Sequence, residues 1–289
     1  MGRYSIKELE RLSGIKAHTI RIWEKRYKLF EPVRTPTNIR YYSDEDLRKL
    51  LSVTLLSNNG VKISKIVSME EQEISSAIKG IKDESIISQK RVDDLIFPML
   101  EFDEDKFNQL FQEYSKELGL EKTFTEVIYP FLEKVGILWL SDEVSPAQEH
   151  FTTHLIRQKL SAAIEALPSV SDQAKKVILF LPEGEYHELG LLFFQFLYKK
   201  KGVRVYYFGQ SVPVEQVKIA SETISPNWIL TYTVIRPKAG TEELIERLSI
   251  CKADEIFFLE NEAQHNSNLN YPSSVSGISH YSQAFLAIQ

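Results

Sequence analysis

The sequence predicts a multidomain protein in three successive parts. An all-α winged helix-turn-helix domain is expected over residues 1–70, a helical bundle over 71–170, and an α/β domain with a Rossmann-like (flavodoxin-like) parallel sheet over 171–289. Three observations support this. Two short amphipathic helices separated by a glycine open the chain, apolar residues recur at helical spacing through the second part, and strands alternate with helices in the third.

Composition excludes several classes of protein. A hydrophobic fraction of 43% and a charged fraction of 26% are typical of a globular protein, and 289 residues suffice for two or three domains. The single cysteine, Cys251, rules out internal disulfides and a cysteine-based metal cluster. The sequence shows no signal peptide and no apolar run long enough to span a bilayer, so we expect a cytoplasmic protein without a membrane partner.

Charge is distributed unevenly along the chain. Residues 1–50 hold 12 Lys and Arg against 7 Asp and Glu, a net charge of +5, whereas the rest holds 23 against 33, a net charge of -10. A basic end on an acidic body indicates a nucleic-acid-binding module joined to another domain.

The first two helices have clear boundary signals. Ser5 and Glu8 have the spacing of a capping box, and Gly14 ends the first helix. The second helix is predicted over residues 17–27, with Ile20 and Trp23 buried. Its opposite face carries the polar and basic residues His18, Thr19 and Arg21. This pattern predicts a helix-turn-helix.

A proline-punctuated hairpin follows over residues 32–42, and its Arg34, Arg40 and Tyr41 are available for phosphate contacts. The alternative is a small helical protein–protein module with a solvated charged face. However, the order Tyr-Ser-Ile-x-Glu-Leu, Gly-Ile, Thr-Ile-Arg-x-Trp-Glu and Arg-x-Tyr-Tyr resembles the winged-helix DNA-binding domain of the MerR family. The resemblance implies base contacts from the second helix, phosphate clamping by the wing, and binding of double-stranded operator DNA as a homo-oligomer, dimer or tetramer.

Two features of the predicted bundle draw attention. Trp139 closes one helix, and Glu149 and His150 lie at the start of the next. Taken alone, Trp139 fits a core residue and the Glu-His pair fits a helix surface. His150 and His154 have the i,i+4 spacing of a zinc pair, but the third ligand is missing.

The spacing of these residues resembles the helical upper half of the CarH/LitR cobalamin-binding module. In that family the tryptophan packs over the upper axial group of the corrin, and the Glu-His pair contacts the adenosyl group. The resemblance therefore implies that Trp139, Glu149 and His150 bind the cofactor from above.

The last third predicts a doubly wound sheet. Strands are expected at 176–182, 203–208, 228–232 and 255–260, helices at 188–200, 213–223 and 241–249, an apolar stretch at 274–278, and a final helix at 281–288. In such sheets ligands bind at the carboxyl ends of strands, where the loop with Glu185 and His187 follows the first strand. A neutral imidazole beside a carboxylate suits a metal ligand oriented by a hydrogen-bond acceptor, for which Glu185 and Ser211 are both candidates.

The loop Glu-x-His-x-x-Gly, ending at Gly190, matches the corrinoid-binding loop of the same family. The resemblance then spans nearly the whole chain. It implies that His187 is the lower axial ligand of cobalt, in place of the cofactor's own base, and that Gly190 lets the helix approach the corrin. The implied cofactor is adenosylcobalamin or methylcobalamin.

The sequence also departs from the family. Leu140 stands where light-responsive members carry a histidine that captures cobalt after photolysis, so a bis-histidine photoproduct is not expected at that position. Glu260, Asn261 and Glu262 follow the fourth strand where a Gly-Gly pair normally lines the nucleotide tail, and Thr231 and Thr233 replace a Ser-x-Leu loop.

The leading interpretation is a DNA-binding transcriptional regulator, a repressor rather than an enzyme. A corrinoid bound between the helical and Rossmann-like domains would control its oligomeric state and operator binding. Two alternatives stay open. The C-terminal half could serve oligomerisation and partner docking without cobalamin, or the chain could be a corrinoid carrier subunit of an enzyme, which the winged helix argues against.

Overall fold

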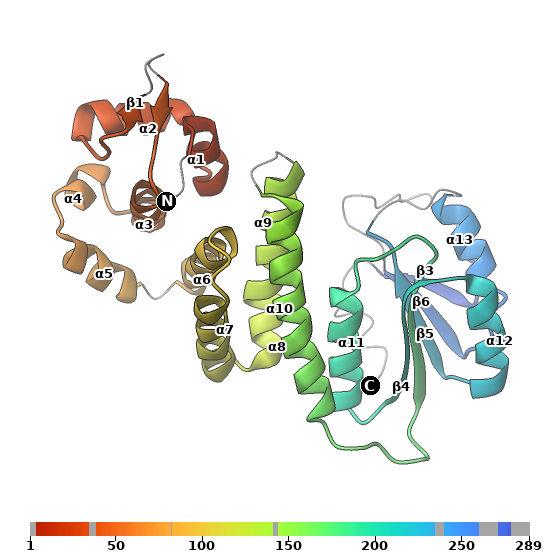
Figure 1. The fold of residues 1–289 in the computed structure, drawn as a ribbon. Coiled ribbons are helices and arrows are strands. Elements are labelled where there is room, and N and C mark those ends of the chain that lie inside the picture. The colour runs from red at the N-terminus through yellow and green to blue at the C-terminus, as the bar shows by residue number, and fades with distance from the viewer. Residues whose placement is uncertain are drawn as a thin grey trace. The chain divides into compact units, whose positions relative to one another are not determined.

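The computed structural model describes residues 4–34, 39–81, 83–140, 144–234, 240–259 and 271–278, without the side chains of Lys79 and Leu140. The chain divides into two compact units, residues 1–152 and 153–289, and the boundary falls inside the long helix α10 (Pro146–Glu165). Figure 1 shows the order of the elements along the chain. The finer division into three domains stays a prediction.

The first unit begins with helices α1 (Ile6–Ser13) and α2 (Ala17–Tyr27). The predicted capping box is present, because the Ser5 hydroxyl accepts the Glu8 amide while the Glu8 carboxylate accepts the Ser5 amide. Gly14 ends α1 in the left-handed region, at φ 74°, where glycine is favoured. These signals fix the turn between the two helices as the sequence predicts.

The wing is a short antiparallel hairpin of β1 (Val33–Arg34) and β2 (Arg40–Tyr41). Helix α3 (Asp44–Asn58) follows, with Ser43 and Asp46 forming a second capping box. Helix α4 (Ile63–Val67) ends this part of the chain. The described residues of the wing therefore form the predicted hairpin.

The remainder of the first unit is helical, as expected from the spacing of its apolar residues. It contains α5 (Glu71–Lys79), α6 (Glu84–Leu100), α7 (Glu104–Leu118), α8 (Leu120–Thr123), the π-helix η1 (Phe124–Ile128), α9 (Tyr129–Leu140) and the first part of α10. The π-helix was not predicted. It joins α8 to α9 without a break in the helical backbone.

The second unit holds a five-stranded parallel sheet in the order β4-β3-β5-β6-β7. Its elements are β3 (Lys176–Pro182), α11 (Leu189–Lys200), β4 (Arg204–Val212), α12 (Val214–Ile224), β5 (Trp228–Tyr232), α13 (Thr241–Leu248), β6 (Glu255–Leu259) and β7 (Val275–Ile278). Numbered within the sheet, this order is 2-1-3-4-5, which is the flavodoxin-like arrangement.

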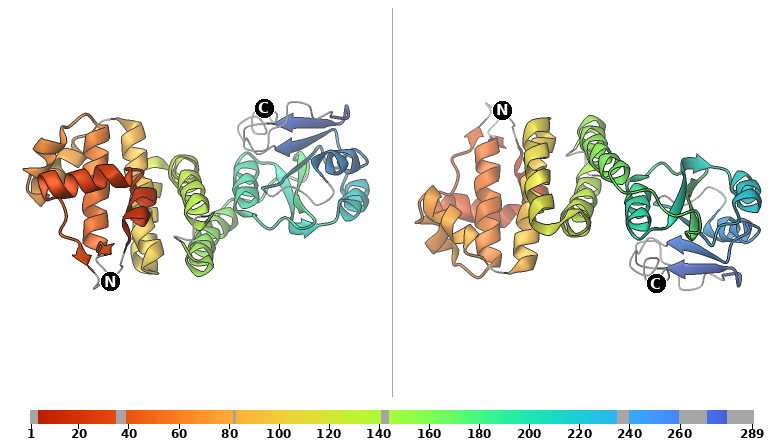
Figure 2. Two further views of the ribbon diagram at one scale, coloured as in Figure 1. Left: turned by 90° about the horizontal axis from the view of Figure 1, so that it is seen from above. Right: turned by 90° about the horizontal axis from the view of Figure 1, so that it is seen from below.

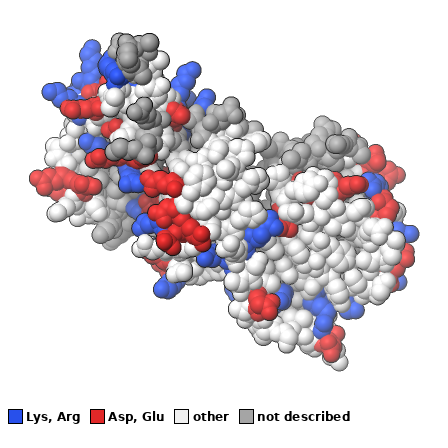
Figure 3. Space-filling view, in the orientation of Figure 1, with Lys and Arg blue, Asp and Glu red and all other residues white. Residues whose placement is uncertain are grey.

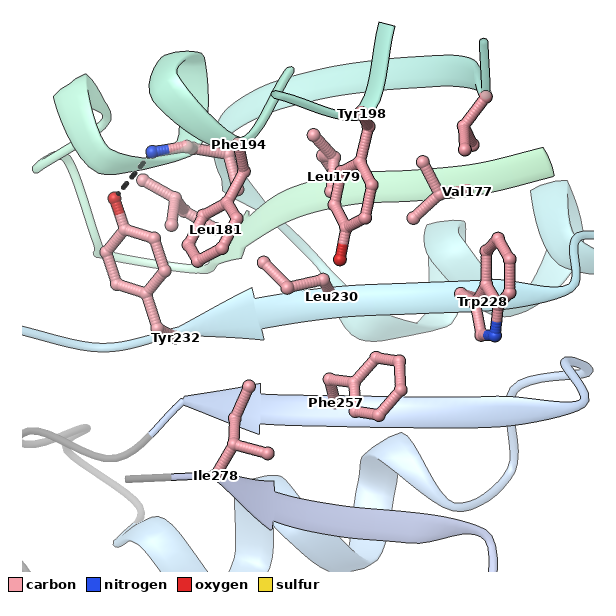
Figure 4. Close-up of a cluster of buried hydrophobic side chains, with 12 residues drawn as sticks. Val177, Leu179, Leu181, Phe194, Tyr198, Trp228, Leu230, Tyr232, Phe257 and Ile278 are labelled. Carbon is pink, nitrogen blue, oxygen red and sulfur yellow. Dashed lines mark hydrogen bonds between the residues drawn. The ribbon is translucent and has the colours of Figure 1, made fainter. Parts of the chain in front are cut away.

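Helices cover both faces of the sheet (Figure 2). Helix α11 packs on one face, where Tyr198 and Phe194 join an apolar cluster with strand residues such as Leu179 and Leu230 (Figure 4). Helices α12 and α13 pack on the other face. Because both faces of the sheet are covered, the inner strands β3, β5 and β6 are largely buried apolar runs rather than alternating ones. The predicted fold class is confirmed.

Strand β4 is longer than predicted, reaching Val212 instead of ending at 208. Leu179 pairs with Tyr207 but Phe180 pairs with Gly209, so one extra residue bulges and the ladder continues beyond it. Elsewhere the predicted strand bounds agree with the structure to within a residue. The expected final helix at 281–288 lies outside the described residues.

Candidate functional site

Helix α2 is held by Ile20 and Trp23, which are buried on its inner face. On its outer face, His18 and Arg21 are exposed and Thr19 is partly exposed. The first turns of this helix therefore present a polar, cationic surface of the kind that reads base edges.

The wing residues are tied to helix α2 through Glu24, which the sequence pattern did not single out. The Glu24 carboxylate accepts Nε of Arg40 at 3.0 Å and the Tyr42 hydroxyl at 2.9 Å, and it lies 4.0 Å from the guanidinium of Arg34. Burial, and then the hydrogen bond to Glu24, raises the pKa of Tyr42, so its hydroxyl stays a donor. Glu24 thereby sets the direction of the hairpin, and the wing arginines stand beside the helix.

Basic side chains gather around the wing end of the first unit, at the top left of Figure 3. Arg34 is exposed, while Arg40 and Tyr41 are partly exposed. The structure therefore brings the predicted phosphate-binding residues together on one hairpin next to α2.

In the second unit, the predicted loop lies between β3 and α11, at the carboxyl end of the central strand. The Glu185 side chain is only 3% exposed, and its Oε1 lies 2.5 Å from Nδ1 of His187. The same oxygen accepts the backbone amides of Tyr186 and His187, at 2.9 and 3.0 Å. Glu185 is therefore the acceptor that orients the imidazole, the first of the two candidates.

The second candidate, Ser211, holds the loop backbone instead. Its amide donates to the Glu185 carbonyl at 3.1 Å, and its hydroxyl accepts the Gly184 amide at 3.1 Å. Ser211 adopts a positive φ of 53°, uncommon for a residue other than glycine, and this turn directs both groups at the loop. In this structure Ser211 therefore supports the loop backbone, whereas Glu185 contacts the imidazole ring.

The end of β5 holds the same loop from another side. The Tyr232 hydroxyl donates to the His187 carbonyl at 2.6 Å and accepts the Leu191 amide at 3.0 Å, the dashed line in Figure 4. Two residues on, the Val234 amide donates to Oε2 of Glu185 at 2.7 Å. One strand end therefore fixes both the backbone of His187 and the carboxylate that orients its ring.

Gly190 lies in the first turn of α11, facing Tyr232. A Cβ at Gly190 would lie 2.8 Å from the Tyr232 hydroxyl oxygen, too close for any ordinary contact. In this structure the glycine makes room for the tyrosine hydroxyl, which is a requirement the sequence did not reveal.

Helix α10 contributes a further polar contact within the second unit. The guanidinium of Arg157 pairs with Glu188, which immediately precedes α11, and Glu188 also accepts the Tyr207 hydroxyl at 3.1 Å. Burial raises the pKa of Tyr207 to about 12, so its hydroxyl donates at neutral pH. Nε of Arg157 is buried without a hydrogen-bond partner. This network anchors α10 to the loop that carries His187.

The three predicted upper-side residues belong to the first unit. Trp139, in the last turn of α9, is 48% exposed and so is not a core residue. Glu149 and His150 lie in the first two turns of α10. Oε2 of Glu149 is 3.3 Å from Nδ1 of His150. The exposed indole and this polar pair suit contact with a large ligand.

The kind of metal that His187 could bind depends on how many other metal-binding side chains lie near it. Across the described ranges, no group of three His, Cys, Asp or Glu side chains could hold a metal ion. A bare zinc ion would need three or four protein ligands, whereas a metal already held in a macrocycle needs only one axial histidine. A single imidazole oriented by a buried carboxylate therefore fits a macrocycle-bound metal.

Some predictions concern residues that the structure leaves out. The side chain of Leu140 and residues 260–262 lie outside the described part of the chain. Thr231 and Thr233, at the end of β5, are both buried. No helix in the described ranges combines the length and apolar character needed to cross a membrane.

Comparison with known proteins defines the class first. The family model for MerR HTH family regulatory proteins matches residues 4–73, and that for a B12 binding domain matches residues 92–164. The chain is thus a MerR-type helix-turn-helix protein that also carries a B12-binding-domain sequence.

Two relatives that match most of the chain show its family. HTH-type transcriptional repressor CarH of Myxococcus xanthus is 31% identical over 252 residues, covering 85% of this chain and 84% of CarH. HTH-type transcriptional repressor CarA of the same organism is 25% identical over 242 residues, covering 82% of this chain and 78% of CarA. The chain belongs to the CarH family of MerR-type regulators, and the resemblance drawn from the sequence is confirmed.

A solved structure supports the fold alone. The monomethylamine corrinoid protein of Methanosarcina barkeri matches 70% of this chain and 98% of its own length, with a TM-score of 0.53 and 14% sequence identity. This likeness agrees with a helical part followed by a parallel α/β sheet.

Proposed function

We propose that this chain is a transcriptional repressor whose oligomeric state and operator binding are controlled by a corrinoid. The observation that carries the proposal is the Glu185–His187 pair at the carboxyl end of β3, in a chain that begins with a MerR-type domain. The relatives' description as transcriptional repressors supports a regulator rather than an enzyme.

The residues have distinct roles in this proposal. His187 would hold the cobalt of the corrinoid through Nε2, because the Glu185 carboxylate accepts a hydrogen bond from Nδ1–H and leaves the lone pair on the other nitrogen. The corrinoid supplies the metal and its remaining ligands. Glu185 and Ser211 hold the loop, and Gly190 packs beside it. Trp139, Glu149 and His150 would offer the same ligand an aromatic surface and two hydrogen-bonding groups.

DNA binding divides between the helix and the wing. His18, Thr19 and Arg21 contact base edges, and Arg34, Arg40 and Tyr41 contact phosphates on either side. Because MerR-type domains bind paired half-sites, two copies of the chain act together on the operator. A ligand that favours one assembly over another thus shifts the population able to hold both half-sites.

The test uses the full chain incubated with adenosylcobalamin in the dark, freed of unbound ligand, and examined by visible absorbance and sedimentation. We expect a bound chromophore and a changed sedimentation coefficient. His187→Ala should abolish uptake, whereas His18→Ala should leave uptake intact and weaken operator binding.

Three outcomes would contradict parts of the proposal. Absence of bound chromophore with unchanged assembly would eliminate the corrinoid as the signal. If His187→Ala takes up the corrinoid as well as the wild type does, His187 does not bind the cobalt. If operator binding by the wild-type protein is the same with and without ligand, the cobalamin-independent regulator is the better description.

A further inference from the structure

Tyr232 occupies the space beside Gly190. Its hydroxyl oxygen lies 2.8 Å from the position a Cβ of Gly190 would take, and its side chain is only 7% exposed. Figure 4 shows the ring standing at the carboxyl end of β5, with its hydroxyl directed at the first turn of α11. The surface of α11 that has no side chain is therefore already in contact with a tyrosine.

The chemistry of a corrinoid makes this contact relevant. The nucleotide tail of cobalamin carries the base that normally binds the lower side of cobalt, so the tail starts on the same face of the corrin as His187. If His187 takes the place of that base, the tail would have to pass the His187 loop to enter the protein. Gly190, three residues further on, offers the low-volume backbone surface that a passing chain needs.

We propose that Tyr232 gates this passage and determines how well the site accepts a corrinoid with a nucleotide tail. This inference rests on the proposed corrinoid-binding function. The tyrosine side chain turns away from Gly190 when the tail enters, and it closes the space otherwise. A corrinoid that lacks the tail does not require this movement.

The gate is connected to the axial ligand. The hydroxyl that fills the space at Gly190 also holds the His187 carbonyl and the Leu191 amide. Its displacement releases both the loop and the first turn of α11, while Glu185 keeps its bonds to the Val234 amide and to the imidazole. Displacement of the Tyr232 hydroxyl would thus change the support of the His187 backbone.

The experiment compares adenosylcobalamin with adenosylcobinamide, which has the same corrin and upper group but lacks the nucleotide. Both are titrated in the dark into the full-length wild-type protein, Tyr232→Ala and Tyr232→Phe, with absorbance as the readout. In Tyr232→Ala, the ratio of the affinity for cobalamin to the affinity for cobinamide should rise by about tenfold or more, because the clash between the side chain and the tail is relieved. Tyr232→Phe should shift this ratio in the same direction by less, because its ring remains.

The ratio separates gating from a structural role. If the tyrosine only supports the fold, its substitution changes the affinities for cobalamin and cobinamide by the same factor, and the gate is disproved. The gate is also disproved if the substitution improves the affinity for cobinamide more than the affinity for cobalamin. Should Tyr232→Ala fail to fold, the direction of the ratio in Tyr232→Phe decides. If the wild-type protein binds neither corrinoid, the proposed function itself fails. This outcome differs from one in which both corrinoids bind but the substitutions at Tyr232 leave the ratio of their affinities unchanged.

Discussion

Nδ1 of His187 lies 2.5 Å from Oε1 of Glu185, whose other oxygen accepts the amide of Val234. Counting the amides of Tyr186 and His187, the buried carboxylate receives three backbone hydrogen bonds besides the imidazole. Several donors compensate the cost of burying this charge, so the carboxylate is held in one orientation. The imidazole is thus directed before any ligand arrives.

Glu185→Gln should weaken corrinoid binding by roughly 10- to 100-fold, the usual effect of losing the group that orients a metal-binding histidine. The amide is nearly the same size but loses the charge that stabilises the Nδ1–H tautomer. Spectrophotometric titration with adenosylcobalamin in the dark measures the change. Glu183→Gln, an exposed glutamate in the same loop, is the matched control and should bind like the wild type. Equal affinity of the two variants would show that Glu185 does not tune the ligand.

Arg40→Ala should weaken binding to all DNA sequences and lower the slope of log affinity against log salt concentration by about 1, as expected for one lost phosphate contact. Its guanidinium is oriented by Glu24, so the charge is placed before DNA arrives. Fluorescence anisotropy with operator and unrelated duplexes, over a series of salt concentrations, measures both quantities. Arg48→Ala, which removes an exposed arginine paired with Glu101, should leave the slope unchanged. A loss confined to the operator duplex would instead assign Arg40 to base reading.

Local patterns sufficed to predict much of the fold. The capping residues around Ser5, the glycine after α1 and the apolar runs of β3 and β5 all act over a few residues, and these elements appear where expected. The pairing of Glu185 with His187 was also accessible, because the two residues are close in sequence.

Contacts between distant residues could not be read in the same way. Tyr232 stands within an apolar strand and looks like an ordinary core residue, yet its hydroxyl reaches a carbonyl 45 positions away. Nothing in the sequence of its helix indicates that Arg157 will meet Glu188. The bulge at Gly209 depends on pairing with β3, so the true end of β4 was hidden as well.

Arg157→Ala should destabilise the second unit by about 1–3 kcal/mol, because it leaves the mostly buried Glu188 carboxylate without its cation. The value stays below that of a fully buried pair since the arginine side chain is about one-third exposed, at 36%. Urea unfolding followed by circular dichroism gives the free energy. Lys218→Ala, which removes one member of the exposed Lys218–Glu222 pair, should cost at most about 0.5 kcal/mol. Equal effects would mean that the Arg157–Glu188 pair adds nothing beyond a surface contact.

Gly190→Ala should destabilise the protein, because the new methyl group would lie 2.8 Å from the Tyr232 hydroxyl. Overpacking of this kind costs about 1–3 kcal/mol, and the better helix propensity of alanine offsets about 1 kcal/mol of it. Gly136→Ala is the control, since nothing lies within 4 Å of its Cβ position and the substitution should be neutral or stabilising.

The cause can be isolated by placing Gly190→Ala in a Tyr232→Phe background. There the nearest atom of the ring is 3.3 Å from the methyl carbon, so the cost of the alanine should fall. A double-mutant cycle on urea unfolding measures the coupling between the two positions, which is expected to be favourable for the pair of substitutions. If the alanine costs as much beside phenylalanine as beside tyrosine, the clash lies elsewhere and the hydroxyl does not set the glycine requirement.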